Sequence, residues 1–160
     1  MINIAINGYK RKMGQVVAEI VTTAFSDKAR ISYGIDVAAD NTGEIPVYAG
    51  AKGIPSDAKA DVIIDFSNPV ALPGLLEYAV TNNIAVVVAT TGLSKEDEKL
   101  MSEASKKIPL FWSANMSLGI CLLKELAKKA AAFLGEGYDI EIVEKHHNRK
   151  LDAPSGTALA

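Results

Sequence analysis

Cysteine, histidine and aromatic residues are scarce in this chain of 160 residues. The one cysteine, Cys121, cannot form an internal disulfide, and its apolar helical surroundings favour a small core residue in a reducing compartment. No apolar run reaches the roughly 20 residues that span a bilayer, and segment 1–7 lacks the basic start of a signal peptide. These absences predict a cytoplasmic protein without a membrane segment.

A large excess of charge of either sign is also missing. The formal net charge is −2 and 49% of the residues are hydrophobic, which argues against a disordered tail and against a nucleic-acid binder. The sequence contains no repeat and no low-complexity tract. This composition is that of a soluble intracellular enzyme, although it identifies none.

Apolar strand-like runs alternate with helical patterns in the first part of the chain. The alternation is typical of a parallel sheet with helices on both faces, so we predict a Rossmann-like α/β domain over residues 1–116. Segment 40–59 is richer in Gly, Pro and small residues and is expected to be mostly loop, with a short strand around Ile45–Tyr48. Strands are expected near 2–7, 31–36, 61–66, 84–89 and 108–112, and helices near 12–25, 69–82 and 94–107.

The sequence pattern over residues 117–160 predicts the start of a second, α+β domain. An amphipathic helix over 117–134 is followed by alternating apolar and polar residues over 138–146, a pattern that favours a half-buried strand. A lone strand cannot form a core. We therefore expect the chain to be a truncated product or one part of a larger enzyme, with doubtful activity if it is complete.

Segment 144–157 concentrates the chemistry, because it holds both histidines of the chain. Histidine donates or accepts protons near neutral pH, and a nearby lysine attracts a carboxylate. The residues from Asp152 onward favour a turn that opens a helix, whose backbone N–H groups bind anions. An acidic small molecule is the expected ligand, although a solvated loop is the alternative. We predict no metal site, because His146 and His147 would face opposite sides of an extended backbone.

A second candidate site follows the first predicted strand. The turn Gly8–Gly14 leads into a helix, as in folds that aim a helix N-terminus at a pyrophosphate. Asp36 ends the second strand, where an acid binds ribose hydroxyls and repels a 2′-phosphate. The cations Lys10, Arg11 and Lys12 favour the phosphate instead. The sequence therefore leaves NADH and NADPH open, with a preference for NADH or dual use, and a purely structural turn is the alternative.

Two further loops follow predicted strands at the edge where open α/β sheets bind ligands. Residues Ala89, Thr90 and Thr91 come after one apolar run, and residues Ser113, Ala114, Asn115 and Met116 come after another. Small side chains there allow a flat ring to approach the backbone. Ordinary helix caps or turns are the alternative for both loops.

The pattern Glu-x-His-His-x-x-Lys-x-Asp-Ala-Pro-Ser-Gly-Thr over 144–157 resembles the signature of the 4-hydroxy-tetrahydrodipicolinate reductase (dihydrodipicolinate reductase) family. The glycine turn, Ile64–Ser67, Ala89–Gly92 and Ser113–Gly119 agree with the family in the same order. The resemblance implies an oxidoreductase of diaminopimelate and lysine biosynthesis that uses NADH or NADPH and assembles as a homotetramer. Arg11 stands where a glycine is expected in dinucleotide-binding turns.

The same resemblance implies roles for individual residues. His146 is expected to protonate the substrate ring as hydride arrives from the nicotinamide. His147 and Lys150 are expected to hold a carboxylate of the cyclic dicarboxylate substrate, and Lys150 to assist proton transfer during loss of the hydroxyl. Gly156 and Thr157 are expected to bind another carboxylate oxygen. The residues expected to contact the cofactor are Gly8, Tyr9, Lys10, Arg11, Lys12, Met13, Asp36, Ala89, Thr90, Thr91, Ser113, Ala114, Asn115 and Met116.

Two other functions stay open on the sequence. The chain is also compatible with a catalytically incompetent nucleotide-binding module, or with a dehydrogenase that acts on another small oxo or imino acid. A requirement for a dicarboxylate substrate distinguishes the second of these from the reductase.

Overall fold

The protein is described by a computed structural model that covers residues 1–40, 42–146, 148 and 153–159. The chain divides into two compact units, Met1–Trp112 and Ser113–Ala160, called here the first unit and the second unit. His147 and Lys150, two of the predicted site residues, lie outside the described residues.

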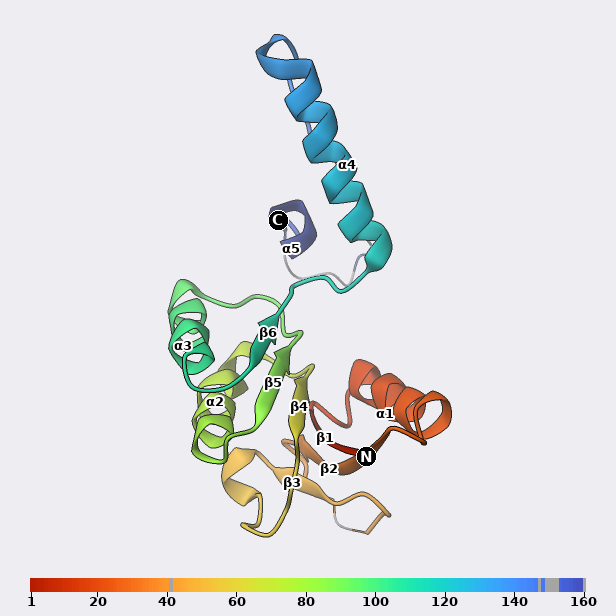
Figure 1. Ribbon diagram of the computed structural model, residues 1–160, viewed down its shortest axis with the longest axis vertical. Coiled ribbons are helices and arrows are strands. Elements are labelled where there is room, and N and C mark those ends of the chain that lie inside the picture. Colours follow the sequence, from red (N-terminus) through yellow and green to blue (C-terminus); the bar gives the residue numbers. More distant parts are fainter. Residues whose placement is uncertain (41, 147, 149–152, 160) are drawn as a thin grey trace. The chain divides into compact units, whose positions relative to one another are not determined.

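The first unit is built on a parallel sheet (Figure 1). Within the described ranges six strands pair in the order β3-β2-β1-β4-β5-β6, and every neighbouring pair is parallel. Parallel neighbours require crossover connections, which helices supply in most α/β folds. The predicted Rossmann-like fold is confirmed. The strands are β1 (Ile2–Asn7), β2 (Ala29–Asp36), β3 (Val47–Ala49), β4 (Val62–Asp65), β5 (Ala85–Val88) and β6 (Leu110–Trp112).

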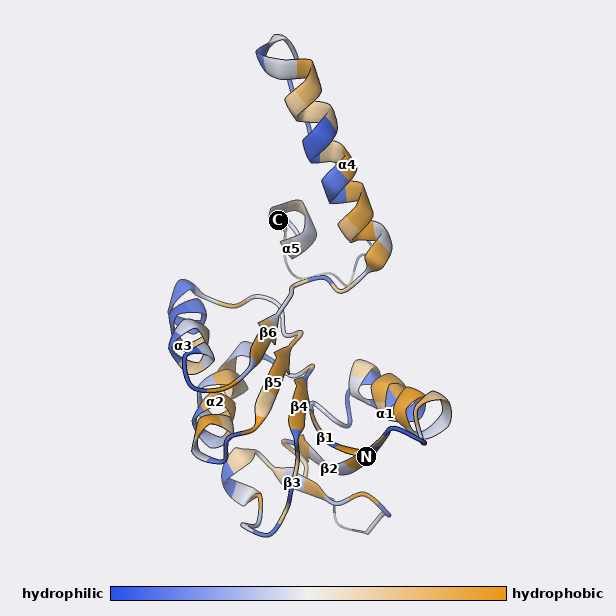
Figure 2. Cartoon of the chain, viewed as in Figure 1, coloured by the Kyte–Doolittle hydropathy of each residue, from blue (hydrophilic) through white to orange (hydrophobic). Residues whose placement is uncertain are grey.

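Helices cover both faces of this sheet (Figure 1). Helix α1 (Lys12–Ala24) packs through Ala18 and Val21 against Ile4 and Ile6 of β1. Helices α2 (Leu72–Thr81) and α3 (Lys95–Ser105) contribute to a separate cluster on the other face, with Ala5 of β1. Successive strand residues point to opposite faces, which is why β1 contributes to both clusters. Apolar residues accordingly line the strands in Figure 2.

The element boundaries depart from the sequence prediction where proline intervenes. The short strand predicted at Ile45–Tyr48 is β3, which begins only at Val47. Pro46 has no N–H to donate, although its carbonyl accepts a hydrogen bond from Gly34 of β2 at 2.9 Å. The helix predicted over 69–82 splits into a 3₁₀ turn, η2 (Pro69–Ala71), and α2. A second 3₁₀ turn, η1 (Ala51–Gly53), follows β3.

The second unit contains a long helix, α4 (Leu118–Leu134), followed by a 3₁₀ turn, η3 (Gly135–Gly137), and the short α5 (Gly156–Leu159). Ser117 caps α4 by accepting a hydrogen bond from the Ile120 backbone N–H at 3.4 Å. Every residue of α4 is described and none is buried. Cys121 is exposed, so the prediction of a core cysteine is wrong.

The strand predicted over 138–146 is also wrong. These residues adopt no regular secondary structure, and Ile140, Ile142 and Val143 are exposed. A strand needs a neighbour to pair its backbone groups, and none of the described residues of the second unit is in a strand. The alternating sequence pattern is therefore present without the sheet that it would need.

No helix in the described part of the chain is both long and apolar enough to cross a membrane.

Candidate active site

The glycine turn between β1 and α1 is tightly folded. Gly8 has a φ of 80°, and a Cβ atom there would stand 2.6 Å from the Phe66 carbonyl oxygen. A Cβ at Gly14 would stand 2.2 Å from the Gly8 carbonyl oxygen, so the first turn of α1 lies directly against the glycine turn. Among the described residues no side chain caps α1, which leaves its first backbone N–H groups available to an anion. The turn therefore fits a pyrophosphate.

Asp36 ends β2 beside this turn. Its Oδ2 atom accepts a hydrogen bond from the Lys10 backbone N–H at 3.0 Å, and its Oδ1 atom accepts one from the Val37 N–H at 2.8 Å. Asp36 lines a crevice of about 80 Å³ together with Gly8, Arg11 and Asn68. A neighbouring depression of about 290 Å³ shares Asn7, Ile35, Gly50 and Ala71 with that crevice. The carboxylate is thus held at a hollow where ribose hydroxyls can meet it.

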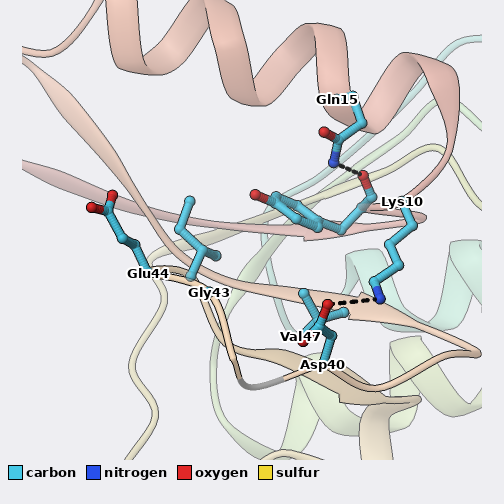
Figure 3. A pocket seen from close by; sticks show the side chains of 8 residues that line it. Lys10, Gln15, Asp40, Gly43, Glu44 and Val47 are labelled. Carbon is cyan, nitrogen blue, oxygen red and sulfur yellow. Dashed lines mark hydrogen bonds and ion pairs between the residues drawn. The ribbon is translucent and has the colours of Figure 1, made fainter.

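The cations of the turn are engaged elsewhere in the first unit. The Lys10 Nζ atom lies 3.2 Å from the Asp40 Oδ2 atom in a second depression, of about 590 Å³ (Figure 3). The Thr42 hydroxyl and backbone N–H, followed by Lys10, lower the pKa of Asp40 from 3.8 to about 2. The Arg11 Nη1 atom donates to the Ser67 carbonyl oxygen at 3.1 Å. Two of the three cations that would favour a 2′-phosphate therefore already have partners.

Tyr9 lines the same depression, and its ring lies against Gly34 of β2. A Cβ atom at Gly34 would stand 2.6 Å from the Tyr9 ring, so glycine is what lets the ring lie on the strand. The Gln15 side chain donates to the Tyr9 carbonyl oxygen at 2.7 Å. Lys12 and Met13 begin α1 and are exposed. The turn is thus fixed from both sides by side chains of the first unit.

The loop after β5 is anchored by Asp65, the last residue of β4. The Thr90 hydroxyl donates to the Asp65 Oδ2 atom at 2.8 Å, and the Ala89 N–H donates to the Asp65 carbonyl oxygen at 2.9 Å. Thr90 thus points its hydroxyl hydrogen into the protein, while Thr91 is exposed. Sequence reasoning quoted Asp65 only as part of a motif. The signal that could have identified Asp65 is an acidic residue at the end of an apolar strand.

In the second unit, the loop of Ser113, Ala114, Asn115 and Met116 contacts the C-terminal segment. The Asn115 Nδ2 atom donates to the Thr157 hydroxyl oxygen at 2.7 Å, and its Oδ1 atom accepts from the Ser117 N–H at 2.8 Å. The Ser113 hydroxyl donates to the Asn115 carbonyl oxygen at 2.8 Å. Two segments that the sequence placed in different sites therefore meet at Asn115 and Thr157.

Glu144 organises the segment that carries His146. Its carboxylate accepts the Ser155 backbone N–H at 2.8 Å and the Ser155 hydroxyl at 2.5 Å, and Ser155 is buried. The His146 Nδ1 atom lies 3.6 Å from the Glu144 Oε2 atom, an ion pair when the imidazole is protonated. The His146 side chain is 40% exposed, so solvent and small molecules reach it. Ser155 in turn accepts the Ala158 N–H at 3.2 Å, which ties Glu144 to α5.

Glu144 and Ser155 were not predicted as site residues, although both belong to the quoted signature. Their side chains connect two stretches of the signature across residues 145–154, a link that a linear pattern does not display. The described residues contain no group of three or more His, Cys, Asp or Glu side chains placed to hold a metal ion.

The parallel sheet, the glycine turn and the acid at the end of β2 define the first unit as a Rossmann-like domain, the fold class that binds dinucleotides at this edge of the sheet. Solved dehydrogenases share the fold. The WlbA dehydrogenase of Bordetella pertussis, in complex with NADH and UDP-GlcNAcA, matches with a TM-score of 0.64 at 15% identity, covering 81% of this chain and 42% of that chain.

The chain belongs to the dihydrodipicolinate reductase family. The family model for the dihydrodipicolinate reductase N-terminus matches residues 2–116, and the one for the C-terminus matches residues 119–160. The resemblance inferred from the motifs is thus confirmed.

Named relatives agree with the family models. The 4-hydroxy-tetrahydrodipicolinate reductase of Caldanaerobacter subterraneus subsp. tengcongensis is 51% identical over 161 residues, covering 99% of this chain and 61% of that protein. The Clostridium novyi enzyme of the same name is 45% identical, covering 99% of this chain and 62% of that protein. The dipicolinate-bound dihydrodipicolinate reductase of Paenisporosarcina sp. TG-14 has a TM-score of 0.69 at 29% identity, covering 99% of this chain and 63% of that chain. The chain therefore spans about three fifths of these relatives' length.

Proposed function

We propose that this protein reduces 4-hydroxy-tetrahydrodipicolinate to tetrahydrodipicolinate with a nicotinamide cofactor, a step of diaminopimelate and lysine biosynthesis. The observation that carries the proposal is family membership over both units, including the signature at 144–157. A relative that is 51% identical bears the name of this reductase, and a relative of known structure binds dipicolinate, a cyclic dicarboxylate.

The adenosine and pyrophosphate part of the cofactor belongs to the first unit in this proposal, and the bound nicotinamide supplies the hydride. The uncapped N-terminus of α1 receives the pyrophosphate, and Asp36 accepts hydrogen bonds from the adenosine ribose. A 2′-phosphate would meet the Asp36 carboxylate while Lys10 is paired with Asp40. We therefore propose NADH as the preferred cofactor, with NADPH also used, because exposed ion pairs such as Lys10–Asp40 are weak.

The loops that follow β5 and β6 are proposed to border the nicotinamide and its ribose. They contain Ala89, Thr90 and Thr91 in the first unit and residues 113–116 in the second. The hydrogen bonds of Thr90 and Asn115 give both loops a defined backbone path, which a ring-binding surface requires.

The substrate is proposed to bind the signature segment. His146 donates the proton that the ring takes up, while His147 and Lys150 hold one carboxylate and Lys150 assists proton transfer as the hydroxyl is lost. The Gly156 N–H and the Thr157 hydroxyl bind another carboxylate oxygen. Glu144 supports these roles, because it lies 3.6 Å from the His146 imidazole and orders the turn at Ser155 that precedes Gly156. In keeping with its family, the enzyme is proposed to work as a homotetramer in the cytoplasm.

Turnover by a chimera tests the reaction. The chain is joined to the C-terminal remainder of the Caldanaerobacter relative, and NADH oxidation is followed with 4-hydroxy-tetrahydrodipicolinate. His146→Gln is expected to lower kcat by roughly 10²- to 10⁴-fold with little change in the Kd for NADH. Asn148→Ala serves as the control, because Asn148 is a spacer in the signature. An unchanged kcat in His146→Gln would remove this histidine from the mechanism, and NADH binding without turnover by the parent would favour a nucleotide-binding module.

Separate titrations with NADH and NADPH test the cofactor assignment in the chain itself. NADH is expected to bind at least as tightly as NADPH. A strong preference for NADPH would show that the cations of the glycine turn outweigh Asp36.

A further inference from the structure

Asp65 is a fully buried acid at the carboxyl end of β4, with 0% of its surface exposed. Among the described residues no lysine, arginine or histidine pairs with it. Its Oδ1 atom accepts hydrogen bonds from the Asn7 Nδ2 atom at 2.8 Å, the Ser67 hydroxyl at 2.6 Å and the Ser67 N–H at 3.1 Å. Its Oδ2 atom accepts from the Thr90 hydroxyl at 2.8 Å.

Packing alone does not require an acid at this position. The neighbouring buried residues Ile63 and Val88 are aliphatic, and an aliphatic side chain would fill the space without the several kcal/mol that desolvation of a carboxylate costs. The donors that offset this cost come from the ends of three strands. Asn7 ends β1, Ser67 follows β4 and Thr90 follows β5. Asp65 is thus the point at which three loops of the ligand-binding edge are joined.

The first of these loops is the glycine turn. Asn7 immediately precedes Gly8, and its Nδ2 atom also donates to the Ser67 hydroxyl oxygen at 2.9 Å. Arg11 donates to the Ser67 carbonyl oxygen, and Gly8 lies against the Phe66 carbonyl. A displacement of the segment after β4 would therefore move the turn proposed to hold the pyrophosphate.

The loop after β5 lies toward the opposite end of the dinucleotide. Asp36 ends β2 and marks the adenosine side, whereas Thr90 follows β5, beyond β1 and β4 in the sheet order. A dinucleotide that crosses this edge brings its nicotinamide half toward the β4 and β5 ends. The link between Thr90 and Asp65 therefore lies toward the part of this sheet edge that would meet the nicotinamide half.

We propose that Asp65 is a positioning residue that holds the glycine turn, through Asn7, and the loop after β5, through Thr90, at the spacing that one dinucleotide needs. This inference rests on the proposed cofactor function. The carboxylate does not touch the cofactor, since all of its surface is covered by protein. Its effect is that both halves of the cofactor meet surfaces that are already in place, so less binding energy is lost in ordering them.

Two variants of Thr90 test the proposal without dismantling the network. Asp65→Ala would leave donors of Asn7, Ser67 and Thr90 unpaired in the interior, and this variant is expected to be unstable. Thr90→Val keeps the shape of the side chain and removes one hydrogen bond, whereas Thr90→Ser keeps the hydroxyl. Binding of NADH and of ADP-ribose, which lacks the nicotinamide, is measured by calorimetry on the whole chain, together with the Tm.

Thr90→Val is expected to raise the Kd for NADH about tenfold, which corresponds to the loss of one hydrogen bond, and the Kd for ADP-ribose less than about twofold. Thr90→Ser is expected to restore the parent's Kd for NADH. Tyr78→Phe is the matched control, because it removes the 3.2 Å bond between the hydroxyls of Tyr33 and Tyr78 elsewhere in the first unit. It is expected to lower the Tm while both Kd values stay unchanged.

Three results would overturn the role of Asp65. Equal weakening of NADH and ADP-ribose in Thr90→Val would show general loosening, and unchanged Kd values with a lower Tm would show a purely structural network. A Thr90→Ser variant as weak as Thr90→Val would show that the hydrogen bond is irrelevant. A parent chain that does not bind NADH would instead overturn the cofactor proposal itself, and the role of Asp65 with it.

Discussion

The two units differ in how much of their apolar surface their own residues cover. In the first unit Leu75 of α2 is 2% exposed and Ile63 of β4 is completely buried. In the second unit Leu122 and Leu126 of α4 are 61% and 55% exposed. Both helices carry an apolar stripe, and only the one that lies on a sheet buries it.

The difference shows what a parallel sheet contributes. A sheet offers two apolar faces, and helices that return across it cover both, so the first unit has a core on each side. A single helix has no such surface, and most helical stability in proteins comes from packing of the apolar face. The candidate site reflects the same contrast. The residues of the first unit that are proposed to bind the cofactor rest on a packed scaffold, whereas the signature segment is held by a few hydrogen bonds such as Glu144–Ser155.

The sharpest test of this contrast truncates one leucine in each unit. Leu75→Ala is expected to lower the free energy of unfolding by about 2 to 5 kcal/mol, because it leaves a cavity in a packed core. Leu122→Ala is expected to change it by no more than about 0.5 kcal/mol, because the side chain is mostly exposed. Urea denaturation, followed by fluorescence of Trp112, the sole tryptophan, measures the first unit, and circular dichroism follows α4. Equal losses in the two variants would abolish the distinction.

Two glycines near helix N-termini are expected to give smaller changes in stability, and the two changes are opposite in sign. Gly14→Ala places a Cβ atom 2.2 Å from the Gly8 carbonyl oxygen, and the forced shift is expected to cost about 1 to 3 kcal/mol and to weaken NADH binding. At Gly119 of α4 the nearest atom, the Ser117 Oγ, would lie 3.8 Å away. Gly119→Ala is expected to stabilise its helix by at most about 1 kcal/mol. Thermal unfolding of both variants decides the signs, and a neutral Gly14→Ala would contradict the close approach.

The smallest expected effect is a loss of stability of the first unit at acidic pH. Thr42 and Lys10 lower the pKa of Asp40 to about 2 in the folded first unit, below the usual 3.8. The resulting contribution to stability is present above about pH 4 and is lost as the pH falls toward 2, because the unfolded state binds the proton first. Asp40→Asn should therefore differ from the parent in its urea midpoint at pH 6, and the difference should shrink between pH 4 and 2. A difference that does not vary with pH would assign the effect to something other than this carboxylate.

Much of the first unit was predictable, because local sequence patterns determine most of its helices and strands. The strand at 2–7 and its glycine turn were predicted from an apolar run followed by glycine, and β1 has those bounds. The helix near 12–25 is α1, one residue shorter. We predicted that the second strand starts at residue 31, but β2 starts at Ala29. Pairing of Ala29 with Ile2 of β1 extends the strand beyond the apolar run that the prediction used.

Other features depended on partners far away in the chain. The pattern over 138–146 is that of a strand, but pairing is a property of two segments, and the described second unit offers no second one. Cys121 has core-like neighbours in sequence and is exposed, since no sheet lies over α4 in the second unit's described residues. Asp65 was not predicted as a site residue, because the local sequence does not show most of its hydrogen-bond partners. Ser67 is two residues away, but the other two donor residues, Asn7 and Thr90, are 58 and 25 residues away in the sequence.

The amino-acid sequence alone determined the fold class of the first unit and the family, because periodic apolar runs and a long motif act through neighbouring residues. Tertiary structure alone decided that Asp65 joins three loops, that Lys10 is paired with Asp40 and that Glu144 orders the turn at Ser155. Hydrogen bonds and ion pairs depend on distances between atoms, and only the folded backbone sets those distances for residues far apart in the chain.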